Sequence, residues 1–468
     1  MHRDLGIEAT FHTQVIERRS YYFFMPSIPM KPALLAAQPS LLSLEEIRKA
    51  ADTYGTPLYL YNLNKVDLQF NTLLQYLPSN FTIHYALKAN SNLAICNKLA
   101  HLDSSVDVSS LGEFQTALKA GFSAQKIVFT GPGKTTEDLS YALEFGCGLI
   151  ALESLNQAQR LNDLARQRRV KQDVIVRINP IYRTIQSCEN QQRCEFKLQQ
   201  EIQTITQSSS KFGVDEENAP ETLIEIMKLS SLNLKGIHIY TESNILAYQD
   251  LLASWQNTVK IANSLRDQGF PISLIDFGGG IGIPYDAAAK PFNFKDFSQG
   301  LKQLFDNNNY SYHCMVEIGR YLVGESGCYL TKITDIKQSR GRLFLILDGG
   351  INHIFRVSKS MKEATKYLEV LSENNKKNSE TVSASLVGRL MTSLDTLAED
   401  VQVPSTIQIG DKIAIHNCGA YGFNHSITNF LLHNYPAEAA YYNGKIMLIR
   451  ERGKADDFFI NQRFFHNI

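Results

Sequence analysis

The stretch HYALKAN, residues 84–90, ends a short apolar run and places Lys88 where a strand should give way to a loop. The whole run, FTIHYAL at residues 81–87, is one of several apolar segments of this length in the chain. A lysine at a strand end is usually solvated, and only sometimes a catalytic amine held in a cleft. The other apolar segments and the residues at their ends are therefore needed to predict both the fold and the role of Lys88.

Similar apolar, β-branched segments lie at residues 56–61, 126–131, 148–154, 173–180, 234–240 and 272–280. Between most of them lie helix-like segments, such as LGEFQTALKAG, which ends at a glycine, and NQAQRLNDLARQRR, which has a charged face. This alternation predicts a parallel sheet covered by helices, either a closed barrel or an open doubly wound sheet. After about residue 315 short strands separated by turns predict a second, mostly β domain. Two polar stretches, 183–210 and 370–384, are predicted to be loops, lids or tolerated insertions.

Composition narrows the class of protein. A chain of 468 residues exceeds what one core usually holds, which favours two domains. Basic and acidic residues number 47 each, and this balance argues against a nucleic-acid partner. No apolar run is long enough to span a membrane, and Asp4 and Glu8 interrupt the N-terminal region, so we expect a soluble cytoplasmic protein without a membrane partner. The seven cysteines form no CxxC pair and the histidines are dispersed, so no metal site is predicted.

The ends of the predicted strands carry a consistent set of reactive and anion-binding residues. They are Lys88, Asp107, Glu113, Arg177, Ser243, the glycines 278–280, Glu317 and Arg320. Glycines let backbone N–H groups approach an anion closely, while a serine hydroxyl and an arginine can donate to a phosphate. An amine, a carboxylate and a phosphate site together are what pyridoxal 5′-phosphate requires. The alternative of a dinucleotide loop in FGGGIGIP is weak, because Ile283 replaces the last glycine of that motif.

The chain resembles the ornithine/diaminopimelate/arginine decarboxylase family of fold type III pyridoxal-phosphate enzymes, and within it the diaminopimelate decarboxylases. Matching motifs run in order from TPLYLY at 56–61 to GAYGF at 419–423. The resemblance implies a parallel (β/α)8 barrel over residues 56–315 that binds pyridoxal 5′-phosphate, and a C-terminal mostly-β domain over 316–468 that contributes to the active site. Residues 1–55 would partly join the β domain. It also implies a small-molecule amino-acid substrate and a homodimer whose active sites are shared through GRLMTSLD and CGAYG.

The resemblance also implies a role for each matching residue. Lys88 would form the imine with the cofactor, and Asp107, Glu113 and Arg177 would border the cofactor and this lysine. Glu317 would face the pyridine nitrogen, and Tyr240 stands where relatives stack a histidine on the ring. The phosphate ligands would be Ser243, Gly279, Gly280 and Arg320, with Tyr421 closing on the phosphate.

Departures from the family pattern concern the substrate. In GRLMTSLD, residues 388–395, Met391 stands where relatives carry a cysteine proton donor, and a thioether has no proton to give. Thr392 stands where an acidic residue would hold the distal amine of the substrate. This argues against lysine, ornithine or diaminopimelate as substrate. Arg356 matches a substrate-carboxylate arginine of the diaminopimelate enzymes, but it could equally be an exposed arginine on a loop.

These observations favour a pyridoxal-phosphate decarboxylase that acts on an amino acid or amino-acid conjugate, in the biosynthesis of a specialised metabolite such as a siderophore or antibiotic. One alternative is a diaminopimelate decarboxylase in lysine biosynthesis. A second keeps the cofactor but changes the outcome, for instance to oxidative deamination, because of Met391. A third is a non-catalytic, decarboxylase-like binding protein.

Overall fold

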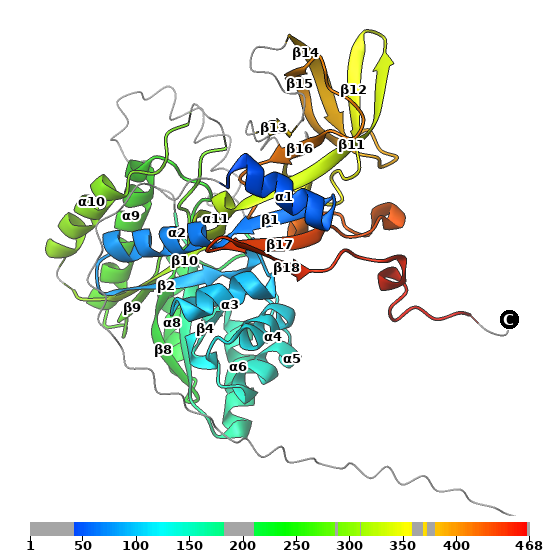
Figure 1. Cartoon of the computed structure of the whole chain (residues 1–468). Coiled ribbons are helices and arrows are strands. Elements are labelled where there is room, and N and C mark those ends of the chain that lie inside the picture. The colour runs from blue at the N-terminus through cyan, green and yellow to red at the C-terminus, as the bar shows by residue number, and fades with distance from the viewer. Residues whose placement is uncertain are drawn as a thin grey trace, which may run out of the picture. The chain divides into compact units, whose positions relative to one another are not determined.

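The computed structural model describes residues 42–181, 210–285, 289–308, 310–357, 368–371 and 380–465. Eight parallel strands of this part form a closed barrel (Figure 1), in the order β5-β4-β3-β2-β10-β9-β8-β6, with β5 pairing β6. The strands are β2 (Phe81–Ala86), β3 (Ser105–Val108), β4 (Ile127–Phe129), β5 (Leu149–Leu152), β6 (Gln172–Asn179), β8 (Leu232–His238), β9 (Leu274–Asp276) and β10 (His313–Ile318). A short strand, β7 (Val214–Asp215), pairs β6. The α/β class and the (β/α)8 barrel are confirmed.

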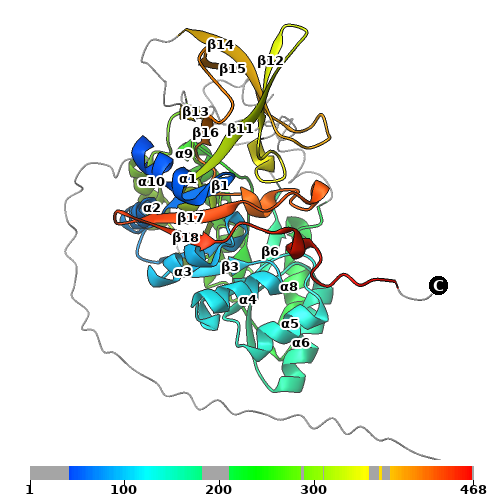
Figure 2. The same ribbon diagram turned by 45° about the vertical axis from the view of Figure 1, so that its right-hand side comes forward.

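Helices alternate with the barrel strands along the chain. They are α2 (Leu63–Tyr76), α3 (Leu93–His101), α4 (Leu111–Ala120), α5 (Thr136–Glu144), α6 (Leu155–Arg168), α8 (Ala219–Met227), α9 (Tyr248–Asp267), α10 (Phe294–Asp306) and the short α11 (Arg320–Val323). The predicted helices are α4 and α6, and Figure 2 shows both on the outside of the barrel. The Ser110 hydroxyl caps α4 by accepting from the Glu113 N–H at 3.2 Å, and Gly121, at φ 102°, ends it.

The second sheet confirms the predicted mostly-β domain. Its strands are β1 (Leu58–Asn62), β11 (Gly327–Ser339), β12 (Arg342–Leu347), β13 (Leu368–Leu371), β14 (Thr381–Val387), β15 (Thr396–Pro404), β16 (Lys412–Ile415), β17 (Ala437–Tyr442) and β18 (Lys445–Arg450). Helix α1 (Leu44–Tyr54) packs its buried residues against this sheet.

The structure corrects the expected limits of the barrel at both ends. Strand β1 pairs antiparallel with β11 and parallel with β17, so residues 58–62 lie in the second sheet. All five side chains of β1 are buried, and a fully buried strand shows the same apolar pattern in either sheet. At the other end β10 runs to Ile318, past the expected limit of 315. The division into two folding domains stays a prediction.

The two polar stretches fall mostly outside the described residues. Of 183–210 only Ser210 is described, so the expected loop there lies outside the structure's described part. Of 370–384, the ends belong to β13 and β14, and residues 372–379 lie outside the described part.

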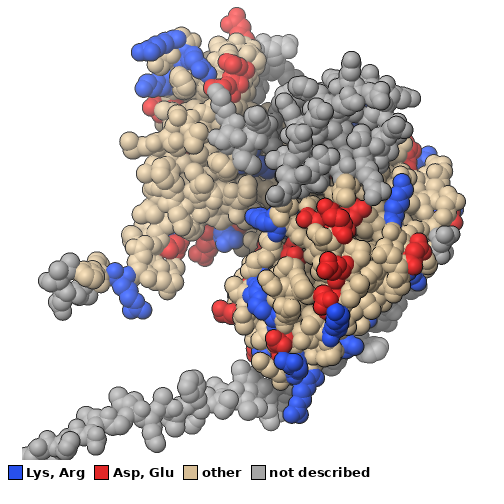
Figure 3. All heavy atoms as spheres, turned by 180° about the vertical axis from the view of Figure 1, so that it is seen from behind, with Lys and Arg blue, Asp and Glu red and all other residues tan. Residues whose placement is uncertain are grey.

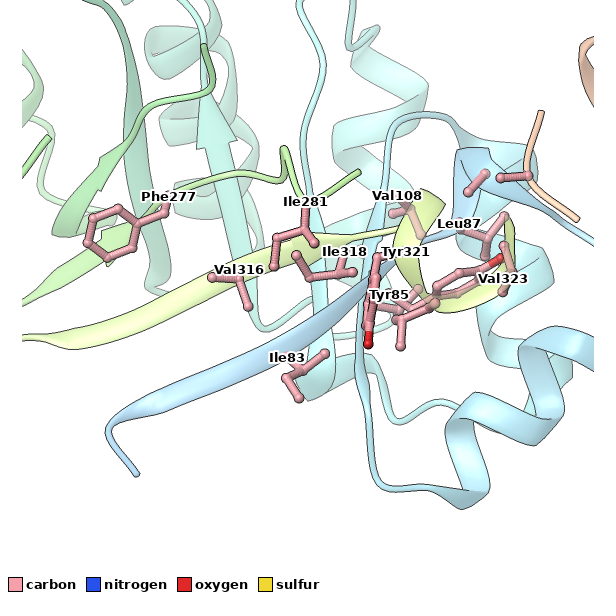
Figure 4. Packing of buried hydrophobic residues seen from close by; sticks show 14 of the residues in the cluster. Ile83, Tyr85, Leu87, Val108, Phe277, Ile281, Val316, Ile318, Tyr321 and Val323 are labelled. Atoms are coloured by element: carbon pink, nitrogen blue, oxygen red, sulfur yellow. The ribbon is translucent and has the colours of Figure 1, made fainter. Parts of the chain in front are cut away.

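Alternate residues of the barrel strands face opposite sides, as the period of two in a strand requires. Ile83, Tyr85, Val316 and Ile318 belong to the large core cluster of Figure 4. Met315, between two such positions, belongs instead to a separate cluster that draws its residues from several barrel strands, namely Val128, Leu149, Ala151 and Ile175. This second cluster fills the interior of the barrel. Positions in step with Met315 therefore point into the barrel.

Lys and Arg are interspersed with Asp and Glu on the face in Figure 3. No helix among the described residues is both long and apolar enough to cross a membrane. The five described cysteines are buried free thiols: Cys96, Cys147, Cys314, Cys328 and Cys418.

Candidate active site

Five ionisable side chains occupy interior positions at the carboxyl ends of the barrel strands. They are Asp107 on β3, Arg177 on β6, His238 on β8, Asp276 on β9 and Glu317 on β10. The strand register places Arg177 beside His238, and His238 beside Asp276. Glu317 lies two residues beyond Met315 and so projects into the barrel as well. This layer of charge on an apolar interior is where enzymes of this architecture carry their chemistry.

Lys88 lies beside this layer, in the short helix η1 (Leu87–Ala89) directly after β2. Its Nζ donates to Oδ2 of Asp107 at 2.9 Å, and the Thr130 hydroxyl donates to the other Asp107 oxygen at 2.6 Å. The Lys88 side chain is 46% exposed, whereas that of Asp107 is 1% exposed. Desolvation acts to lower the pKa of Lys88, but the carboxylates of Asp107 and Glu317 outweigh it and raise the pKa. Asp107 therefore holds the charged Lys88 amine at the strand end, while part of the Lys88 side chain remains exposed.

Glu317, Asp276 and His238 form a buried group behind the lysine. Oδ2 of Asp276 and Oε1 of Glu317 accept no hydrogen bond from any described N–H or O–H group. Desolvation, and after it the charge of Asp107, raises the pKa of both carboxyls, that of Asp276 to about 7. Asp276 raises the pKa of Glu317 further, whereas the hydrogen bond with Glu317 acts to lower that of Asp276. Desolvation, followed by the charge of Arg177, holds the pKa of His238 well below its usual range. At neutral pH the two carboxyls therefore share a proton beside a neutral imidazole.

This buried group fits a cationic ring nitrogen at Glu317 better than it fits a metal ion. Its three members offer ligand atoms within 4.8 Å of one another, although the dispersed histidines predicted no metal site. His238 Nε2 and Glu317 Oε2 lie 3.9 Å apart. Three ligands, of which one carboxyl holds a proton, make a poor cation site. A buried carboxylate that lacks a donor is instead well suited to a protonated pyridine nitrogen.

A pocket opens above this group. The residues that line it are Ala86, Lys88, Tyr240, Ser243, Asn244, Gly279, Gly280, Ile281, Glu317, Ile318, Gly319, Arg320 and Tyr421. The fold thus brings together most residues that the strand ends and the family resemblance singled out. A Cβ atom at Gly279 would lie 2.5 Å from the Glu317 carbonyl oxygen, so only glycine lets the two strand ends approach this closely. The same Cβ would lie 4.0 Å from the Tyr240 ring, which places that ring at the pocket wall.

Arg320 organises the end of the pocket expected to bind phosphate. Its Nη2 donates to the Ser243 hydroxyl at 3.4 Å, and its guanidinium lies over the Tyr421 ring, 4.8 Å from the centroid. The Tyr421 N–H donates to the Ala89 carbonyl at 2.8 Å, next to Lys88 in the same chain. Tyr421 thus belongs to the same subunit as Lys88. This corrects the expectation that CGAYG carries the sharing of sites between subunits.

Glu113 and Arg177, like Asp107, border the site but are not among the described residues that line the pocket. Glu113 accepts from the Ser109 N–H at 2.7 Å, and burial raises its pKa. Arg177 lies 3.4 Å from Oε1 of the buried Glu153, and its guanidinium covers the Phe212 ring at 4.5 Å. Both residues still interact electrostatically with the site. The charge of Lys88 acts to lower the pKa of Glu113, and the charge of Arg177 acts to lower the pKa of Glu317.

The three residues predicted to meet the substrate are not among the described residues that line the pocket. Arg356, in η5 (Phe355–Val357), is 1% exposed, so the reading of it as an exposed loop arginine is wrong. Its Nη2 donates to the Asn417 carbonyl at 2.9 Å, and its guanidinium lies over the Tyr285 ring. Met391 is 88% exposed, and neither it nor Thr392 is among the described residues lining the pocket.

Sequence reasoning missed three residues of the site. None of His238, Asp276 and Tyr285 was singled out from the sequence alone. Asp276 directly precedes the glycine run in LIDFGGG, and a carboxylate at a barrel strand end was a usable signal. Tyr285 follows the same run, but no local pattern indicates that it meets two arginines.

Three comparisons with known proteins agree with this geometry. A family model described as "Pyridoxal-dependent decarboxylase, pyridoxal binding domain" matches residues 63–324. Diaminopimelate decarboxylase of Helicobacter pylori is 32% identical over 86% of this chain and 95% of its own length. The L-glutamyl-[BtrI acyl-carrier protein] decarboxylase of Niallia circulans is 29% identical over 90% and 97%. A crystal structure of the H. pylori diaminopimelate decarboxylase complexed with L-lysine aligns with a TM-score of 0.77 at 30% identity, covering 88% of this chain and 98% of that one.

Proposed function

This chain belongs to the family of pyridoxal-dependent decarboxylases, and from that premise we propose that it decarboxylates an amino acid whose distal end carries no free ammonium group. It is a carboxy-lyase with pyridoxal 5′-phosphate as its cofactor. When bound, the cofactor supplies a protonated aromatic ring that accepts the electron pair left on the substrate when carbon dioxide departs. The residues around the cofactor would bind it, orient it and hold or transfer protons.

The residues in and around the pocket divide the work of holding the cofactor. The Lys88 amine would hold the cofactor's aldehyde group, and Asp107 would position that amine. Glu317 would hold the protonated ring nitrogen, and Tyr240 would pack against the ring. Arg320, the Ser243 hydroxyl and the backbone N–H groups of Gly279 and Gly280 would hold the phosphate. Tyr421 would close this end of the pocket, and Glu113 and Arg177 would border the cofactor.

The substrate class rests on one observation: the segment with Met391 and Thr392 has no carboxylate where relatives bind a distal amine. An unpaired ammonium in a partly desolvated pocket would cost several kcal/mol, or about a hundredfold or more in specificity. A hydroxyl, amide, carboxylate or acyl conjugate avoids this cost. The relative from N. circulans, named for a glutamyl group on a carrier protein, supports a conjugated substrate. Such a reaction would suit the biosynthesis of a specialised metabolite.

Steady-state kinetics on a panel of substrates tests the proposal. Diaminopimelate, lysine and ornithine should be turned over at least about a hundredfold less efficiently than glutamate or a glutamyl thioester of pantetheine. Thr392→Asp should shift this preference toward ornithine and lysine, while Thr392→Val serves as a control that adds no charge. Mass spectrometry of the products distinguishes simple amines from oxidised products. Oxidised products are the alternative outcome, because Met391 replaces the cysteine that donates a proton in relatives.

A second candidate substrate is diaminopimelate, favoured by the names of several relatives and by Arg356 at the position of a carboxylate-binding arginine. If diaminopimelate is the best substrate by a wide margin and Thr392→Asp does not change the preference, the inference from Thr392 fails. The lysine-forming reaction would then be the function.

A further inference from the structure

We propose that Tyr285 is a positioning residue that links Arg320, at the phosphate end of the cofactor site, to Arg356, which the family resemblance matches to a substrate-carboxylate arginine. This inference rests on the proposed roles of Arg320 and Arg356 and adds a residue that neither the sequence motifs nor these roles single out. Tyr285 lies two residues after Ile283, beyond the glycine run, and is 9% exposed.

The two functional parts of the Tyr285 side chain meet different arginines. Arg320 Nη1 donates to the Tyr285 hydroxyl at 2.9 Å. Arg356 lies over the Tyr285 ring, with its guanidinium carbon 4.2 Å from the centroid. One buried side chain therefore contacts Arg356 through its ring and Arg320 mainly through its oxygen, since the Arg320 guanidinium carbon lies farther from the ring centroid, at 5.5 Å.

The surrounding contacts hold this arrangement in place. Arg356 donates to the Asn417 carbonyl, and the Asn417 side chain donates to the Pro284 carbonyl at 2.9 Å, directly before Tyr285. These contacts close a loop through Pro284, Tyr285, Arg356 and Asn417, which ties the barrel segment after β9 to the segment after β16. On the other side, Arg320 also meets Ser243 and Tyr421. Displacing Tyr285 would remove one contact from each of the two guanidinium groups.

The chemistry of the two contacts predicts two separable effects. A hydrogen bond from an arginine holds the guanidinium at one angle, and the phosphate ligand loses that angle when the acceptor is removed. A ring under a guanidinium stabilises the cation and fixes its plane, with no need for the hydroxyl. Removing the hydroxyl alone should therefore affect the cofactor, and removing the ring should affect the substrate as well.

The test compares Tyr285→Phe with Tyr285→Leu. The Phe variant should raise the dissociation constant of pyridoxal 5′-phosphate about fivefold to tenfold, measured by titrating the cofactor-free protein and following cofactor absorbance. Its KM for the best substrate of the panel, at saturating cofactor, should stay unchanged because the ring remains. The Leu variant should raise the cofactor dissociation constant similarly and raise the KM about tenfold in addition. Tyr285→Met replaces it if the Leu variant does not fold.

Tyr312→Phe is the matched control, since Tyr312 is also buried, its hydroxyl donates to Asn263 Oδ1 at 2.7 Å, and it is not among the described residues that line the pocket. It should change neither constant. Unchanged cofactor affinity in Tyr285→Phe, or an equal KM increase in the Phe and Leu variants, overturns the link while leaving the proposed function standing. A wild-type protein that neither binds the cofactor nor decarboxylates any amino acid overturns the proposed function, and the link with it.

Discussion

Lys88 shows how one residue becomes a candidate for catalysis through its neighbours. Its position at a strand end is common, but Lys88 also contacts the buried Asp107, and a buried carboxyl group is costly unless hydrogen-bond donors or a cation satisfy it. Thr130 supplies a donor and Lys88 the charge. Because Lys88 lines the pocket, its amine would be available to an aldehyde bound there.

We expect the purified protein to be yellow, with cofactor bound covalently to Lys88. Borohydride reduction followed by digestion and mass spectrometry should recover the cofactor on the peptide that contains Lys88. Lys88→Ala should abolish this adduct. Lys134→Ala is the matched control, because Lys134 is a buried lysine that donates to the Gly131 and Ala151 carbonyls. Recovery of the cofactor on another lysine would refute the assignment of the site.

The shared proton of Asp276 and Glu317 should set the pH dependence of stability of the cofactor-free protein. Folding raises the pKa of Asp276 to about 7, from an unfolded value near 4. The folded state therefore holds a proton that the unfolded state releases, and the free energy of unfolding falls as pH rises from about 4 to about 7. Asp276→Asn should flatten this fall and retain the bond to the Gly278 N–H.

Urea unfolding of the cofactor-free protein at several pH values between 5 and 8 measures this effect. The gain of Asp276→Asn over wild type should be larger at pH 8 than at pH 5. Asp163→Asn, a change at an exposed residue of α6, controls for the loss of one carboxylate. A gain that is equal at all pH values would mean that Asp276 holds no proton in the folded state.

At the scale of elements, the loop between β14 and β15 is fixed from inside its own chain. The buried Asp395 accepts from the Ile351 and Leu390 N–H groups, both at 2.8 Å. A Cβ atom at Gly388 would lie 2.2 Å from the Asp395 carboxylate, so a glycine is required there. The loop is therefore held in one shape while Met391, 88% exposed, and Leu394, 55% exposed, face outward. Exposed apolar residues on a fixed loop favour contact with another chain.

At the scale of the whole molecule, we propose a homodimer in which loop 388–395 of one subunit completes the pocket of the other. An isologous dimer would contain two such sites, each with Lys88 and Tyr421 from one chain. Mixing a Lys88→Ala chain with a Thr392→Arg chain should restore about a quarter of wild-type activity, because half of the dimers are mixed and each has one intact site.

The control for this mixing experiment is Lys88→Ala with Tyr421→Ala, which should give no restoration, since both residues serve the same pocket. Sedimentation velocity at micromolar concentration should show the dimer. A fully active monomer would exclude shared sites.

The sequence by itself predicted alternating strands and helices, a second β domain and reactive residues at the strand ends, and its resemblance to a known family added the closed barrel and the roles proposed for the cofactor residues. The alternation is a local feature, so it can be read directly from the pattern of the chain. Only the tertiary structure decided that β1 pairs β11 and β17, that Asp276 meets Glu317, and that Arg356 is buried over Tyr285. It also decided that Tyr421 shares a chain with its Lys88. These are contacts between segments far apart in sequence, and no local pattern of hydrophobicity or charge specifies which distant partner a residue meets.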